Sequence, residues 1–152
     1  MKYLLMFSVL FLSSCNNVNY VYTKFQKDFS ENRWFNDDIR LFEVTIEDDV
    51  QLYDLEVQFG HIYDYNLDNV PLEVVIKAPS GTIERLKVDV LIKGKDGKDL
   101  GDCTGDICDV YHVLKSKASL EKGVYAIEIK QASKLVYLPN VLGIGLNVRK
   151  SN

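Results

Sequence analysis

Apolar and polar side chains alternate along most of the chain, and a period of two is typical of β-strands with one buried face. The clearest segment is 52–60, in which aromatic and aliphatic residues alternate with Asp54, Glu56 and Gln58. We expect this segment to be a half-buried antiparallel strand. The same pattern, weaker in the first segment, predicts strands at 18–29, 41–47, 72–78, 83–92, 110–118, 124–130 and 141–148.

Seven or eight strands joined by short turns predict an all-β fold, an antiparallel β-sandwich of jelly-roll-like or immunoglobulin-like build. Residues 21–152 are expected to form this single domain. Separate structures are predicted for two of the segments that connect the strands. Residues 93–109 hold four glycines and five aspartates and predict a structured surface loop. Residues 131–138 are expected to form one helical turn, ended by Pro139.

The first residues have the layout of an export signal. Met1-Lys2 precedes an apolar run at 3–12, and the small pair Ser13-Ser14 precedes Cys15. The run is shorter than the roughly 20 residues that a membrane-spanning helix needs. Leu12-Ser13-Ser14-Cys15 looks like a bacterial lipobox. It predicts removal of residues 1–14, fatty acyl chains such as palmitate on Cys15, and a polar tether at 15–20. The alternative is an ordinary signal peptide that leaves Cys15 as a free thiol.

The charge of the chain disfavours two classes of binding partner. The formal net charge is −4, and no basic cluster stands out. An acidic surface disfavours nucleic acid and also disfavours anionic lipid as an electrostatic ligand. The lipid on Cys15 is therefore the expected contact with a membrane.

Two further cysteines, Cys103 and Cys108, are separated by four residues that include a glycine. In an oxidising compartment such a pair can form a disulfide. Zinc is the alternative. It is disfavoured because no second ligand pair is evident and the chain has only two histidines, His61 and His112. We expect no metal and no cofactor beyond the covalent lipid.

Catalytic motifs are not evident, and we expect no catalytic residues and no enzyme. The aspartates of 93–109 could supply oxygens for calcium, but interspersed lysines favour a solvated turn. The histidines have no partner that spacing identifies. Trp34 is expected to fill the core. A binding rim for sugar or protein, made of Trp34, Tyr63, Tyr65 and Asn66, is the alternative; packing over a sheet edge is the simpler expectation for the tyrosine segment.

Several motifs resemble the gliding-motility lipoprotein GldH family of Bacteroidota. The resemblance runs from the lipobox through Trp34 and the Asn-, Asp- and Tyr-rich segment 63–69 to the C-terminus. It is most specific in Gly123-Val124-Tyr125, Glu128-Ile129-Lys130-Gln131-Ala132, Leu138-Pro139-Asn140-Val141 and Gly143-Ile144-Gly145-Leu146. Asp99 departs from the pattern, because the family often has an aromatic residue there. The Cys103/Cys108 pair is not a family feature.

The resemblance implies a role and no reaction. It implies a membrane-anchored lipoprotein of the cell envelope that is needed for gliding motility, an accessory of the motility and type IX secretion machinery. Asn16-Asn17-Val18-Asn19 lacks the acidic residues that mark surface export in this phylum, so a periplasm-facing anchor is expected. Two other functions remain open: a lipid-tethered periplasmic or surface sandwich that binds carbohydrate or protein, and, less favoured, a hydrolase.

Overall fold

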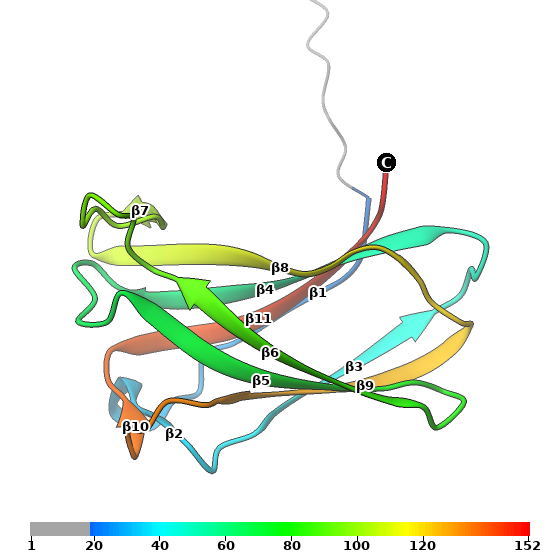
Figure 1. Ribbon diagram of the computed structural model, residues 1–152, viewed down its shortest axis with the longest axis horizontal. Coiled ribbons are helices and arrows are strands. Elements are labelled where there is room, and N and C mark those ends of the chain that lie inside the picture. The colour runs from blue at the N-terminus through cyan, green and yellow to red at the C-terminus, as the bar shows by residue number, and fades with distance from the viewer. Residues whose placement is uncertain (1–18) are drawn as a thin grey trace, which may run out of the picture.

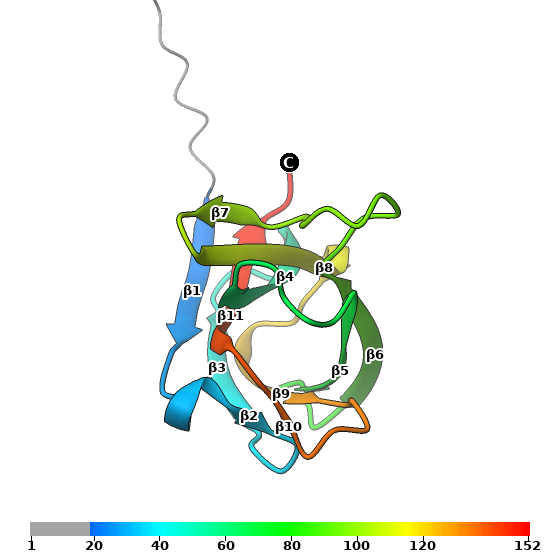
Figure 2. The same ribbon diagram turned by 90° about the vertical axis from the view of Figure 1, so that its left-hand side faces the viewer.

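A computed structural model describes residues 19–152 as two antiparallel sheets packed face to face (Figures 1 and 2). One sheet has five strands in the order β1-β11-β4-β8-β7, and the other has four in the order β3-β9-β5-β6. A two-stranded pair, β10-β2, lies at one end. The strands are β1 (Tyr20–Gln26), β2 (Trp34–Phe35), β3 (Arg40–Ile46), β4 (Leu52–Ile62), β5 (Asn69–Lys77), β6 (Ile83–Leu91), β7 (Asp102–Thr104), β8 (Ile107–Ser119), β9 (Gly123–Gln131), β10 (Tyr137–Leu138) and β11 (Val141–Lys150), with one 3₁₀ turn, η1 (Ser30–Asn32).

The predicted all-β antiparallel sandwich is confirmed. The strands beyond the expected seven or eight are β2, β7 and β10, which have only two or three residues each. Within residues 19–152 no helix is long and apolar enough to cross a membrane. The signal segment 1–14, Cys15 and the tether up to Val18 lie outside the described residues.

Alternation along the strands builds the core between the sheets. In β3 every second residue is buried, and Phe42, Val44 and Ile46 point inward. The same alternation in β4 buries Leu55 and Phe59 against them. At the two open edges of the sandwich, β6 lies beside β8 and β1 beside β3 (Figure 2). Leu86 and Val88 of the edge strand β6 are therefore only partly buried.

Residues 131–138 do not form the predicted helical turn. The backbone N–H of Ser133 donates to the Gln131 side-chain oxygen at 2.8 Å, and the N–H of Leu135 donates to the Ser133 hydroxyl at 3.3 Å. These side chains capture donors that a helix would have used. The segment then enters β10, which pairs with β2.

The region 93–109 is more ordered than a single loop. It contains β7 and the start of β8, which form a hairpin around a two-residue turn at Gly105-Asp106. Gly105 has φ +62°, as the first central position of a type II′ turn requires. Ahead of it, the N–H of Leu100 donates to the Ile92 carbonyl at 2.8 Å and folds residues 93–101 back onto the sheet.

Phe25 of β1 covers three glycines on the outer face of the five-stranded sheet. A Cβ atom on Gly60, Gly143 or Gly145 would lie 2.8, 2.2 or 2.8 Å from an atom of the Phe25 ring. Because glycine has no side chain, these three positions leave room for the Phe25 ring. This contact joins β1, the edge strand, to β11 and β4.

A Gly143→Ala substitution is expected to lower the free energy of unfolding by about 1–3 kcal/mol, because the new methyl group overlaps the Phe25 ring. Removing the ring by Phe25→Ala should relieve part of that cost, so the double variant should lose less than the two single variants added together. Urea unfolding of the four proteins, followed by far-UV circular dichroism, measures the coupling. Additive losses would contradict the contact.

Candidate functional site

Trp34 is a core residue and not an exposed platform. Its side chain is 0% exposed, and its ring lies 5.6 Å from that of Phe29. The indole Nε1–H donates to the Asp38 carbonyl at 2.9 Å. The pairing of β2 with β10 turns Trp34 inward and leaves Phe35 on the surface.

Tyr65 is also buried, with 2% of its surface exposed. Its ring lies edge-on to Phe59 at 5.7 Å and 5.1 Å from the His61 ring. Burial raises the pKa of the Tyr65 hydroxyl well above its ordinary value. Tyr63 and Asn66, in contrast, point to solvent. The four residues Trp34, Tyr63, Tyr65 and Asn66 therefore do not form an exposed rim, because the rings of Trp34 and Tyr65 are buried in the core.

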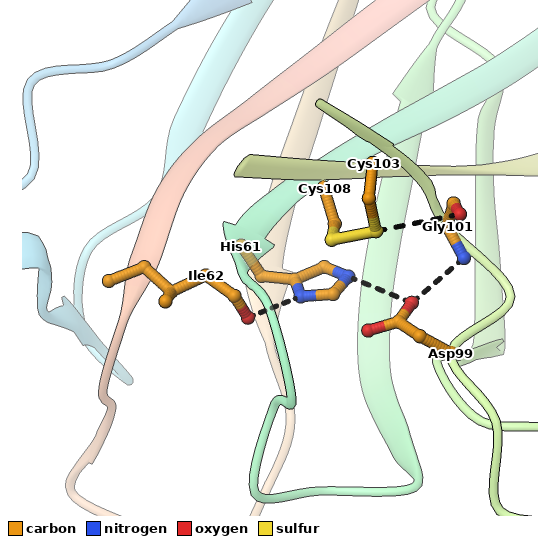
Figure 3. The surroundings of a disulfide bond; sticks show 6 residues. All are labelled: His61, Ile62, Asp99, Gly101, Cys103 and Cys108. Carbon is orange, nitrogen blue, oxygen red and sulfur yellow. Dashed lines mark hydrogen bonds and ion pairs between the residues drawn. A yellow bond between two sulfur atoms is a disulfide. The ribbon is translucent and has the colours of Figure 1, made fainter. Parts of the chain in front are cut away.

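The structure joins Cys103 and Cys108 in a disulfide with an S–S distance of 2.02 Å (Figure 3). The two residues face each other across the β7–β8 hairpin, with Cα atoms 4.1 Å apart. Cys108 also pairs with His61 of the neighbouring strand β4. The strand register therefore brings a histidine next to the disulfide.

His61 is fully buried beside this disulfide. Its Nδ1 lies 2.9 Å from the Ile62 carbonyl, so Nδ1 carries the hydrogen and donates it. Its Nε2 lies 3.8 Å from Oδ1 of Asp99 (Figure 3), which is too long for a hydrogen bond. Within residues 19–152, Nε2 has no hydrogen-bond partner.

Asp99 lies in the loop before β7 and completes a cluster with His61, Cys103 and Cys108. Its Oδ1 accepts a hydrogen bond from the Gly101 N–H at 2.8 Å, and its Oδ2 is buried with no partner in the described part of the chain. Asp96, Asp102 and Asp106 are exposed, as a solvated turn predicts. The sequence spacing Asp-x-Gly does signal the Asx turn at Asp99, but nothing in the spacing signals its burial.

Two open clefts follow the edges of the sandwich. One, of about 520 Å³, lies where Lys115 of β8 meets Glu84 of β6 at 2.6 Å. The other, of about 580 Å³, is lined by Tyr22, Tyr53 and Lys150, among others. As far as the structure describes the chain, neither cleft is lined by a histidine or a cysteine.

His112 lines a third cleft, of about 400 Å³, together with Asp102 and Asp109. Among the described residues, no carboxylate oxygen lies within 4.0 Å of its ring nitrogens. The histidine that does face a carboxylate is His61, and it is sealed from solvent. A general base needs contact with the proton that it removes, so the buried pair is not arranged for hydrolysis.

The GldH lipoprotein family matches residues 20–148. A relative, the gliding motility lipoprotein GldH homolog of Christiangramia forsetii, is 25% identical over 158 residues, which cover 99% of this chain and 95% of the relative. Among solved structures, dimeric latent PorU from Porphyromonas gingivalis aligns with this chain at 10% identity and a TM-score of 0.37. The alignment covers 88% of this chain and 13% of the PorU chain. A likeness at that score supports no inference. The family match extends from β1 to β11, and the chain therefore belongs to the GldH lipoprotein family.

Proposed function

We propose that this protein is a non-enzymatic lipoprotein, anchored through lipid on Cys15, that is needed for gliding motility. It acts as an accessory component of the motility and type IX secretion machinery. Membership of the GldH lipoprotein family carries the proposal. The name of the Christiangramia forsetii relative, a gliding motility lipoprotein GldH homolog, supports it.

The arrangement of the chain ends is compatible with a tethered domain. The N–H of Lys150 donates to the Asn19 carbonyl at 3.0 Å, so the first described residue lies beside the last strand (Figure 1). In the same sheet Tyr20 pairs with Arg149, whereas His61 pairs with Val141. At about 3.3 Å per residue, the disulfide hairpin is thus roughly 25 Å along the sheet from the tethered end. In this proposal, partners contact this far end, away from the membrane.

Ligand binding by exposed aromatic residues is the weaker alternative, because Trp34 and Tyr65 are buried. A periplasm-facing anchor remains part of the proposal and rests on the neutral residues Asn16-Asn17-Val18-Asn19.

Crosslinking in native membranes tests the proposed function. The tagged full-length protein should recover motility or secretion subunits. A matched control carries residues 1–19 fused to an unrelated soluble domain, so that it shares the anchor but not the sandwich. Recovery of the same proteins with both would contradict a specific assembly.

A further inference from the structure

We propose that the cluster of Cys103, Cys108, His61 and Asp99 is a redox-gated zinc site. In the disulfide form both sulfur atoms are bonded to each other. After reduction, Cys103 and Cys108 supply two thiolates, and His61 and Asp99 supply a nitrogen and an oxygen. Together these four side chains form a closed four-ligand site for one Zn²⁺ ion, made of the sulfur, nitrogen and oxygen donors that zinc accepts.

The positions of the donor atoms support a metal site. The ligand atoms of His61, Asp99 and Cys108 all lie within 4.8 Å of one another. Around a tetrahedral zinc, with bonds of about 2.0–2.3 Å, donor atoms are roughly 3.3–3.8 Å apart. Shifts of about 1 Å would bring these three donor atoms to that spacing, and reduction would let the two sulfur atoms, 2.02 Å apart in the disulfide, separate to it. Cys103 faces Cys108 across the hairpin and brings the fourth donor.

Two buried atoms of the cluster have no hydrogen-bond partner among residues 19–152: Nε2 of His61 and Oδ2 of Asp99. Buried polar atoms are nearly always paired, so each orphan calls for an explanation. The Nδ1–H of His61 is held by the Ile62 carbonyl, which leaves the Nε2 lone pair free. Metal-binding histidines are oriented in this way by a carbonyl or carboxylate on the other nitrogen. The Gly101 N–H orients Asp99 in the same manner.

Sequence spacing agrees with this assignment. Cys103 and Cys108 are separated by four residues, which lies within the range found for paired zinc ligands. The sequence alone shows no second ligand pair for zinc. The fold supplies that pair from β4 and from the loop before β7 (Figure 3).

The gating step is a thiol–disulfide exchange with a dithiol reductant. The reductant loses two electrons and two protons and forms its own disulfide, while the Cys103–Cys108 bond breaks to give two thiols. Binding of Zn²⁺ then displaces both thiol protons, because the thiolate is the ligand. Since zinc binds the reduced form alone, it favours reduction by mass action.

Zinc titration of oxidised and reduced protein tests the site. The full-length chain in detergent carries Cys15→Ser, so that the pair in the hairpin holds the only thiols. The reduced protein should bind one Zn²⁺ per chain in competition with a chromophoric chelator, and the oxidised protein should bind none. With Co²⁺ as a probe, the reduced protein should show thiolate-to-cobalt charge transfer and the intense visible bands of tetrahedral coordination.

Variants separate a four-ligand site from a simple dithiol. His61→Gln and Asp99→Asn should each weaken zinc binding by the reduced protein at least about tenfold. The controls His112→Gln and Asp96→Asn replace the same residue types outside the cluster and should leave the affinity unchanged. Affinity unaffected by His61→Gln and Asp99→Asn would overturn the proposal. Should a variant fail to fold, an octahedral Co²⁺ spectrum without charge transfer in the reduced parent would overturn it equally.

Discussion

A Cys15→Ala substitution is expected to abolish lipid attachment and to stop cells from spreading. Each CH₂ group that enters a bilayer contributes about 0.8 kcal/mol, and stable anchoring takes more than one acyl chain. Without the thiol no chain can be attached, and the acidic domain has no electrostatic attraction to anionic lipid. Labelling with a fatty-acid analogue measures lipid attachment, membrane fractionation measures anchoring, and colony spreading measures motility.

The matched control is Cys103→Ser with Cys108→Ser, which removes the other two cysteines but keeps Cys15. This variant should still carry the fatty-acid label and should remain in the membrane fraction. A Cys15→Ala strain that spreads normally, with the unlabelled protein released from membranes, would refute the need for the anchor. A label that persists in Cys15→Ala would refute the lipobox itself.

The second large effect concerns stability. Trp34→Ala should lower the free energy of unfolding by about 3–5 kcal/mol, because it empties a fully buried site. It also removes the N–H that donates to the Asp38 carbonyl. Against a typical total of about 5–15 kcal/mol, such a loss leaves a marginal fold. Urea unfolding of residues 16–152, followed by far-UV circular dichroism, gives the value without relying on the fluorescence of this single tryptophan.

Phe35→Ala is the control for position and residue class. Phe35 is the next residue of the same strand but points outward, 37% exposed, with its ring 5.4 Å from that of Tyr137. Its loss should cost about 1 kcal/mol. Similar losses at both positions would show that Trp34 does not have the packing role described above.

The strands were predictable because a period of two survives in any sheet that buries one face. The pattern at 52–60 needs no knowledge of its neighbours, and β4 covers it fully. Residues 131–138 could not be assigned in that way. The capture of backbone N–H groups by Gln131 and Ser133 competes with a helical turn, and only the pairing of β10 with β2 decides between them.

The site was less predictable than the fold for a physical reason. His61 and Cys108 are 47 positions apart in sequence and meet only because β4 and β8 are adjacent in the sheet. Asp99 enters the cluster because residues 93–101 fold back toward Ile92, a contact that depends on the finished sheet. Local composition makes Asp99 look the same as its exposed neighbour Asp96.

The position of β1 has a mechanical consequence for a protein held at a membrane. β1 begins at the tethered end and runs antiparallel to β11, from Tyr20 opposite Arg149 to Gln26 opposite Ile144. If a partner grips the far end, tension on Asn19 acts along β1 in shear. The backbone hydrogen bonds of β1 then share the force together instead of opening one after another. The Phe25 ring packs over Gly143 and Gly145 and sterically opposes the sliding of β1 along β11.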